Sequence, residues 1–104
     1  VIVDHNKLQA MDDLENIVHM KPFGEKWKAF GWNVMDIDGH NYVEIKEALL
    51  ERKAGKPTLV VANTVKGKGV SFMENEPIWH YRMPNKQELP ILMEELGLTE
   101  EDLT

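Results

Sequence analysis

The chain contains no cysteine. This absence excludes a disulfide framework and any metal site built from thiolates, and it makes a reducing cytoplasm the expected compartment. Long hydrophobic runs are missing too, because no apolar stretch approaches the roughly 20 residues that a membrane-spanning helix needs. The sequence also lacks internal repeats and low-complexity tracts. We therefore expect a soluble globular protein.

Clusters of basic residues are also absent. The net charge is −6, and lysine and arginine occur singly or in pairs, which argues against nucleic acid or an anionic membrane as the main partner. The 104 residues suffice for one compact unit but not for two. The sequence begins inside an apparent strand, with no capping turn before Val1. We therefore expect residues 1–104 to form a single partial domain, a piece of a larger protein.

Three apolar segments of strand length are present, at residues 1–3, 33–38 and 58–62. Each is short and rich in valine, isoleucine or leucine, which is typical of buried parallel strands. Polar residues follow each segment. Ligands bind at the carboxyl ends of the strands in open α/β sheets, so these polar residues are candidates for a site.

Two helices are predicted between these strands. Pro22 suits a first helical turn, and Phe23, Trp27 and Phe30 recur at helical spacing until Gly31, so we expect these three aromatic residues in the core. Residues 10–22, before this helix, read as a loop with a partial helix, and we assign its His19 no role.

The second helix has the clearest signals. Asn41 and Glu44 form a capping pair, and the helical pattern runs through Arg52 to Gly55. Strand, helix, strand, helix, strand at these lengths predicts parallel βαβ units, and therefore an α/β fold with a Rossmann-like sheet. The carboxyl ends of all three strands then lie at one edge.

The carboxyl-terminal third is less regular. Residues 66–69 alternate lysine and glycine and open a connection of roughly 20 residues, which is typical of a functional or a disordered loop. The glycines would let the backbone approach a phosphate; a plain basic turn is the other interpretation. In the tail, Asn85 and Glu88 form a capping pair, whereas Pro90 favours a helix that starts there and ends at Gly97. Thr99 and Asp102 favour a final capped turn.

Asn6 is the first candidate ligand at the sheet edge. Its amide oxygen and a nearby backbone carbonyl are hard donors of the kind that Mg²⁺ prefers when it binds with phosphates. A strand that ends in Asp-His-Asn is also an ordinary entry into a turn, so both interpretations stay open at this point. Two neutral oxygens do not hold such an ion, and a carboxylate from elsewhere must help.

Several segments together resemble the thiamine-diphosphate enzyme transketolase, most of all the split type whose amino-terminal subunit is a separate chain. The segments are Val3-Asp4-His5-Asn6-Lys7-Leu8-Gln9, Glu25-Lys26-Trp27-Lys28-Ala29-Phe30-Gly31-Trp32, Asp36-Ile37-Asp38-Gly39-His40, Lys56-Pro57-Thr58, Thr64-Val65-Lys66-Gly67-Lys68-Gly69-Val70-Ser71-Phe72-Met73-Glu74-Asn75 and Trp79-His80. The resemblance covers nearly the whole chain in order. It corresponds to the second half of the pyrophosphate-binding domain.

The resemblance implies thiamine diphosphate as cofactor, anchored through Mg²⁺, Ca²⁺ or Mn²⁺. The metal ligands would be Asn6, the carbonyl of Leu8 and an Asp from a Gly-Asp-Gly motif, which these 104 residues do not contain. The cofactor-binding positions would be Asn6, Leu8, Ala10, Lys66 and His80, and His80 would be the catalytic residue, orienting diphosphate or sugar oxygens. Ala10 and Lys66 stand where the family often has a larger apolar residue.

The implied activity is transfer of a two-carbon ketol unit between sugar phosphates. The implied partners are the missing amino-terminal half and a subunit with the pyrimidine-binding domain, which would supply the glutamate that activates the aminopyrimidine. Two other hypotheses stay open. One is a related thiamine-diphosphate enzyme, such as deoxyxylulose-phosphate synthase or a 2-oxoacid dehydrogenase component. The other is a non-catalytic α/β interaction module.

Overall fold

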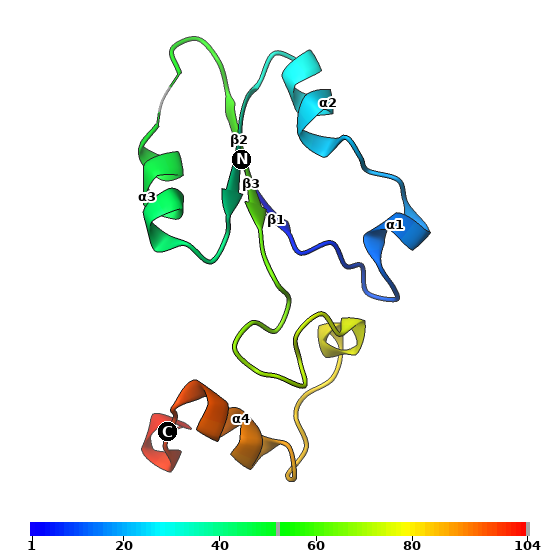
Figure 1. The fold of residues 1–104 in the computed structure, drawn as a ribbon, viewed down its shortest axis with the longest axis vertical. Helices are drawn as coiled ribbons and strands as arrows, with labels where there is room; N and C mark the ends of the chain where they lie inside the picture. Colours follow the sequence, from blue (N-terminus) through cyan, green and yellow to red (C-terminus); the bar gives the residue numbers. More distant parts are fainter. Residues whose placement is uncertain (52, 104) are drawn as a thin grey trace.

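A three-stranded parallel sheet forms the centre of the molecule (Figure 1). The computed structural model describes residues 1–51 and 53–103. The strands are β1 (Ile2–His5), β2 (Asn33–Asp38) and β3 (Thr58–Asn63), in the order β1-β3-β2. Val3 pairs with Val61, and Val34 pairs with Leu59. The three predicted strands and their parallel arrangement are confirmed.

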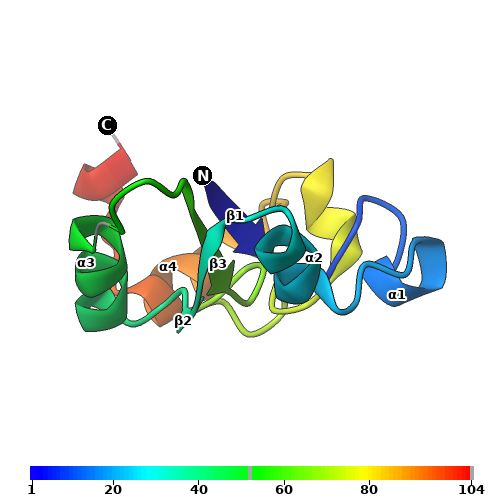
Figure 2. The same cartoon turned by 90° about the horizontal axis from the view of Figure 1, so that it is seen from above.

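Helices lie on both faces of this sheet. The helices that pack on it are α2 (Phe23–Ala29) and α3 (Tyr42–Leu50). The other elements are α1 (Leu14–Ile17), α4 (Leu89–Leu96) and the 3₁₀ turns η1 (Pro77–His80) and η2 (Glu100–Leu103). Figure 2, which looks along the sheet from above, shows α2 and α3 on opposite sides of the strands. The arrangement is the predicted Rossmann-like α/β fold. Within residues 1–51 and 53–103, every helix is too short or too polar to cross a bilayer.

The alternation of side chains along β3 divides the core between the two faces. Val60 packs with Ile37 and Ala48 on the side of α3, and all three are buried. Leu59 and Val61, the next residues along the strand, point to the other face and are the most completely buried large side chains described. A central strand that is apolar on both sides is therefore what the continuous run at 58–62 encodes.

The three aromatic residues expected in the core are not buried there: Phe23 and Trp27 are only partly buried, against other rings. Phe23 stacks on His5 with ring centroids 5.8 Å apart, and Trp27 meets Trp32 edge-on at 4.9 Å. Phe30, also expected in the core, is 84% exposed, so that prediction was wrong. The helix ends at Ala29, so Phe30 is its C-cap and has left the helical periodicity on which the prediction depended.

The cap of α3 is the predicted one. The Asn41 side chain accepts hydrogen bonds from the backbone N–H groups of Val43 and Glu44, and its own amide donates to the Glu44 carboxylate at 2.9 Å. The predicted end was wrong, because α3 stops at Leu50 rather than near Gly55. The residues after Leu50 are polar and offer no apolar face to bury. Arg52, predicted to continue the helix, lies outside the described residues.

Both features predicted for residues 85–97, the Asn85–Glu88 pair and a helix that starts near Pro90, are present in the structure. Asn85 and Glu88 exchange hydrogen bonds of 2.8 and 3.0 Å in a turn, and α4 begins directly after it with Pro90 in its first turn. Gly97 ends α4 in the left-handed conformation at φ 64°. Thr99 donates to Asp102 at 2.7 Å ahead of η2, as predicted, and these bonds lower the pKa of Asp102. Figure 1 shows α4 beyond the carboxyl ends of the strands.

Candidate functional site

The carboxyl ends of the three strands meet in a polar edge. His5, Asn63 and Asp38 are register partners across the sheet. The Asn63 side chain lies 3.2 Å from the His5 ring nitrogen Nδ1 and also donates to the carbonyl of Ile37 at 3.2 Å. The edge is therefore tied together by one amide side chain, and the strand ends have a fixed relative position.

The chain turns sharply where β1 ends. The Asn6 side-chain oxygen accepts a hydrogen bond of 3.0 Å from the N–H of Leu8, and Lys7 between them has a left-handed φ of 63°. The carbonyl of Lys7 accepts from Leu14 at 2.9 Å, which holds the following segment against the turn. The ordinary turn expected for Asn6 is thus present. It leaves one lone pair of the amide oxygen for another partner.

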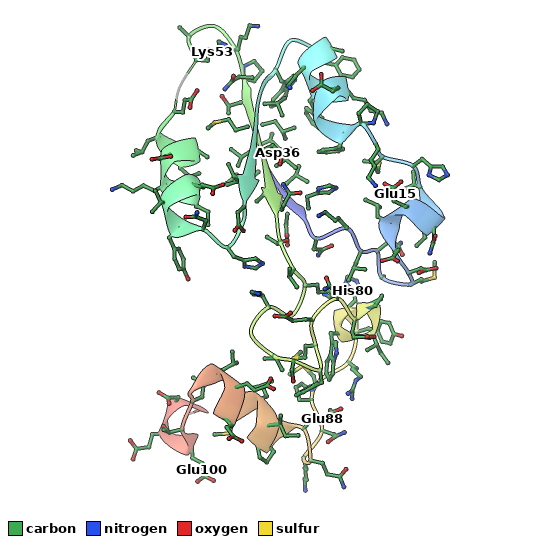
Figure 3. All side chains as sticks on the ribbon, in the orientation of Figure 1. Glu15, Asp36, Lys53, His80, Glu88 and Glu100 are labelled. Atoms are coloured by element: carbon green, nitrogen blue, oxygen red, sulfur yellow. The ribbon has the colours of Figure 1, made fainter. Side chains whose placement is uncertain are left out.

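A pocket of about 370 Å³ opens beside this turn. It is lined by Asp4, Asn6, Leu8, Gln9, Ala10, Lys66 and His80. All five residues predicted to bind the cofactor therefore lie around one pocket, although the sequence separates the first from the last by more than 70 positions. Figure 3 shows His80, on η1, next to the segment that follows β1.

Two lining residues, Asp4 and Gln9, were not among the predicted site residues. Asp4 accepts a hydrogen bond from the Thr64 hydroxyl, which links β1 to the segment after β3. A signal for Asp4 was present in the sequence, because it is a carboxylate near the carboxyl end of a strand, where ligands of parallel sheets bind. Gln9 lies well beyond the strand and carried no such signal.

The segment just before Lys66 is hydrogen-bonded to the turn that follows β2. The backbone N–H of Val65 donates to His40 Nε2 at 2.8 Å, and the N–H of Gly39 donates to the carbonyl of Asn63 at 2.8 Å. A side chain at Gly39 would lie 2.4 Å from Thr64. The prediction that these segments share one edge is confirmed, and this packing directs Lys66 toward the pocket.

The loop at 66–75 closes on itself. The N–H of Asn75 donates to the carbonyl of Lys66 at 3.0 Å, and Gly67 has φ 74°. A Cβ on Gly67 would lie 2.4 Å from the Met73 carbonyl oxygen, so only glycine fits there. This close approach sets the path of the backbone directly after Lys66.

The Glu74 side chain holds the same loop through a hydrogen bond and an ion pair. The Gly69 N–H donates to the Glu74 carboxylate at 3.1 Å, and this bond, assisted by Lys68, holds the pKa of Glu74 below its usual value. Lys68 lies 3.6 Å from Glu74. Of the two lysines in the motif, Lys66 therefore lines the pocket and Lys68 pairs with a carboxylate.

Two oxygen donors at the pocket are the candidates for binding a metal ion. Asn6 offers its amide oxygen, and none of the described residues donates a hydrogen bond to the carbonyl of Leu8. No cluster of three or more His, Asp or Glu side chains suited to a metal ion occurs in the part of the chain that the structure describes. The donors therefore fit a hard divalent ion only with an additional charged ligand.

Comparison with known proteins identifies the family. Residues 1–103 match the family described as "Transketolase, thiamine diphosphate binding domain". The chain belongs to this family. The match begins at Val1, directly before β1, and ends at Leu103, the last residue of η2.

Curated relatives include separate transketolase subunits. The chain is 38% identical over 97 residues to an apulose-4-phosphate transketolase subunit of Actinobacillus succinogenes, and the match covers 92% of this chain and 35% of that protein. It is 44% identical over 79 residues to the 6-deoxy-6-sulfo-D-fructose transketolase subunit SqwG of a Clostridium species, covering 74% of this chain and 29% of that protein. The chain thus spans about a third of these relatives.

The fold agrees with a solved transketolase. The crystal structure of transketolase from Campylobacter jejuni matches with a TM-score of 0.80 and 27% identity, over 93% of this chain and 15% of that chain. The resemblance to transketolase drawn from the sequence is confirmed by both the family match and the fold. The 104 residues are a fragment of a domain in this family.

Proposed function

We propose that residues 1–104 form part of the thiamine diphosphate site of an enzyme that transfers a two-carbon ketol unit between sugar phosphates. The observation that carries the proposal is the pocket at the carboxyl edge of the sheet, which Asn6, Leu8, Ala10, Lys66 and His80 all line. Ligands of parallel α/β sheets bind at this edge. The family match supplies the class of cofactor.

A divalent ion, Mg²⁺ by preference, would be held by the side-chain oxygen of Asn6 and the backbone oxygen of Leu8. Both donors are neutral, and stripping water from Mg²⁺ needs carboxylate or phosphate oxygens as well. The diphosphate would supply some of them, and an Asp in a Gly-Asp-Gly motif, in the amino-terminal half of the domain, would supply another. Ca²⁺ or Mn²⁺ would fit the same oxygen ligands.

Thiamine diphosphate, when bound, supplies the carbanion chemistry. The residues of this chain orient it. Lys66, half-buried at the pocket wall, places a cation near the diphosphate, while Ala10 offers a small apolar contact on the opposite segment. His80 is the catalytic residue: its imidazole, at the pocket and open to solvent, donates or accepts at a sugar or diphosphate oxygen.

The complete enzyme would have a second subunit. The relatives from Actinobacillus succinogenes and Clostridium are named as transketolase subunits, and their substrates are named as sugar derivatives. We assign this chain a partner subunit with the pyrimidine-binding domain, which supplies the glutamate that activates the aminopyrimidine. The substrates are a ketose phosphate donor and an aldose phosphate acceptor, and the expected compartment is the cytoplasm.

Product analysis of the complete enzyme tests this function. With thiamine diphosphate and Mg²⁺, we expect two-carbon transfer from xylulose phosphate to ribose phosphate and no reaction with pyruvate. Reaction with pyruvate alone would instead identify a synthase or dehydrogenase of the same cofactor class. Failure to react with either, together with no cofactor binding, would favour a non-catalytic interaction module.

The role of His80 is tested in the same assay. Because it contacts substrate or cofactor oxygens, His80→Ala should lower kcat/KM roughly 100-fold or more, within the range for a lost proton-transfer group. His19→Ala is the matched change, since His19 is exposed and its ring lies 3.7 Å from the nearby Glu15 carboxylate. Equal kinetics for the two variants would remove His80 from the site.

A further inference from the structure

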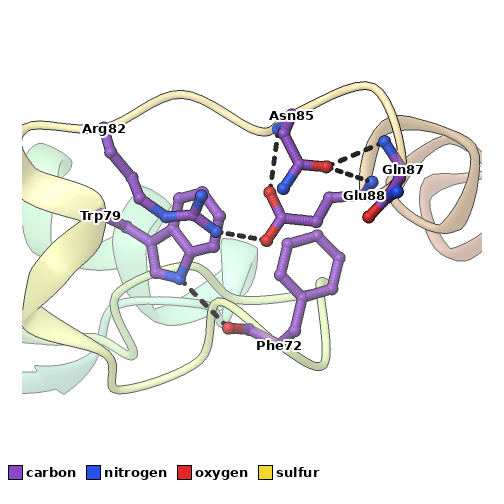
Figure 4. A network of polar contacts seen from close by, with 6 residues as sticks. All are labelled: Phe72, Trp79, Arg82, Asn85, Gln87 and Glu88. Carbon is purple, nitrogen blue, oxygen red and sulfur yellow. Dashed lines mark hydrogen bonds and ion pairs between the residues drawn. The ribbon is translucent and has the colours of Figure 1, made fainter.

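The residue directly before His80 is held on three sides (Figure 4). The indole N–H of Trp79 donates to the carbonyl of Phe72 at 3.1 Å, and the Phe72 ring packs against it with centroids 5.4 Å apart. The guanidinium carbon of Arg82 lies 3.9 Å from the centre of the Trp79 ring. Rotation of Trp79 would break a hydrogen bond, an aromatic contact and a cation–π contact together.

Arg82 is itself fixed by the start of α4. Its guanidinium forms an ion pair with the Glu88 carboxylate, and the two side chains are 31% and 24% exposed. The other oxygen of Glu88 accepts the backbone N–H of Asn85 at 2.8 Å, while the Asn85 side chain accepts from Glu88 and Gln87. Figure 4 shows these contacts as one continuous network from Phe72 to Gln87.

Trp79 and His80 are consecutive residues of the four-residue turn η1. Side chains of successive residues in a 3₁₀ turn are about 120° apart, since the turn has three residues per revolution. Fixing the ring of Trp79 on one side therefore fixes the direction of the His80 side chain on another. His80 lines the pocket, and among the described residues no hydrogen bond to its ring restrains it directly.

We propose that Glu88 and Arg82 are positioning residues for His80, acting through the Trp79 ring. The inference rests on the catalytic role proposed for His80. It makes α4 a brace for the site: its N-cap residue Glu88 holds η1 through Arg82, and within the helix Glu95 accepts hydrogen bonds of 2.6 and 2.5 Å from the backbone N–H and hydroxyl of Ser71. The helix thereby restrains both segments that bring Lys66 and His80 to the pocket.

A purely stabilising role is the competing explanation. Exposed ion pairs contribute little to stability, because solvent screens them and ordering two long side chains is costly. This pair is half-buried and charge-assisted, and it is stacked on an aromatic ring, so its geometry is better defined than that of an exposed pair. Glu88 also makes no side-chain hydrogen bond that caps α4, so its removal leaves the helix's own hydrogen bonds intact.

A double-mutant cycle in the complete enzyme separates the two explanations. Glu88→Ala should lower kcat/KM about 5- to 30-fold when His80 is present, and less than about twofold in the His80→Ala background, as coupled residues do. Glu94→Ala removes the same charge from an exposed position on α4 and should leave kcat/KM unchanged in both backgrounds. The same fold loss for Glu88→Ala in both backgrounds, or no loss, would overturn the proposal.

Hydrogen exchange gives a readout that needs no activity. In Glu88→Ala, the amides of residues 78–82 should exchange faster than in the unsubstituted enzyme, whereas Glu94→Ala should leave them unchanged. Unchanged exchange in Glu88→Ala would overturn the brace. If the unsubstituted enzyme transfers no ketol unit, the proposed function fails, and this exchange result still decides whether the brace exists.

A second variant, Arg82→Met, tests the same proposal if Glu88→Ala does not fold. It keeps an unbranched chain over the Trp79 ring but removes the charge that Glu88 binds. We expect the same dependence on His80 and the same faster exchange at 78–82. An Arg82→Met enzyme with unchanged kcat/KM and unchanged exchange would contradict the proposal.

Discussion

The sheet and the segment that follows it are held together by different forces. Among the described residues of 1–63, the buried side chains are apolar and lie on β2, α3 and β3: Ile37, Ala48, Leu59, Val60 and Val61. Within the described part of residues 64–103, Val70 is the one fully buried apolar side chain. That second region is organised instead by carboxylates, glycines and an indole, through contacts such as Gly69 to Glu74 and Arg82 to Glu88.

This difference separates the stability of the domain from the geometry of its site. Burial of apolar surface is non-directional and scales with area, so it secures the sheet without specifying fine geometry. Hydrogen bonds and ion pairs are directional but contribute less to stability in water. The pocket lies between the two regions, with Asn6 and Leu8 from the first and Lys66 and His80 from the second.

The largest expected effect on stability is in the sheet. Leu59 is fully buried, so Leu59→Ala should lower the free energy of unfolding by about 2–5 kcal/mol through lost burial and the cavity left behind. Leu50→Ala, at a residue that is 70% exposed, should cost much less. Urea unfolding of the complete protein measures both. Equal losses would mean that the sheet is not the stabilising core.

Substitution of Gly67 should lower stability less than Leu59→Ala does, but it should disturb the site more. Gly67→Ala and Gly55→Ala both place alanine at φ near 75°, which costs about 1–2 kcal/mol. At Gly55 no atom of the described residues lies within 4 Å of the added Cβ, whereas at Gly67 the Cβ meets the Met73 carbonyl. We expect Gly67→Ala alone to weaken thiamine diphosphate binding measured by calorimetry. Equal cofactor affinity in the two variants would contradict the role given to this loop.

The smallest effect concerns pH. The Gly69 N–H lowers the pKa of Glu74, so the carboxylate stabilises the folded loop above its ordinary pKa of 4.5 and loses this contribution as the pH falls through the lowered value. The Gly69 amide resonance of glycine-labelled protein should therefore titrate with a midpoint below 4.5. In Glu74→Gln this titration should vanish. A midpoint at or above 4.5 would show that the hydrogen bond is not formed in solution.

The range of the interactions, local or long-range, also explains which features could be predicted from the sequence. The β2 and β3 strands and the Asn41 cap were predicted because their signals are local: apolar runs, and an Asn-to-Glu spacing that matches a capping box. Phe30 and the end of α3 were predicted wrongly for the converse reason. The helical pattern in the sequence continues through Phe30 for α2 and toward Gly55 for α3. Both helices end earlier in the structure, where neither the sheet nor a cap supports another turn.

The pocket itself could not be predicted from local patterns. Asn6 was a candidate because it follows a strand, but Lys66 and His80 were assigned only through the resemblance to transketolase. Their approach to Asn6 depends on long-range contacts, such as Val65 with His40 and Trp79 with Phe72, that no local spacing encodes. Glu88 was predicted only as the capping partner of Asn85, and nothing in the sequence indicated its ion pair with Arg82.

Cofactor binding by the Asn6→Ala variant tests the central claim most directly. Thiamine diphosphate is titrated into the complete enzyme with Mg²⁺, and the heat of binding gives Kd. Loss of one metal ligand should weaken binding roughly 10- to 100-fold, as loss of even a supporting residue does at metal sites. Asn16→Ala, at an exposed residue of α1, should leave Kd unchanged. If Asn6→Ala binds thiamine diphosphate as tightly as the unsubstituted enzyme, the sheet edge is not the metal site.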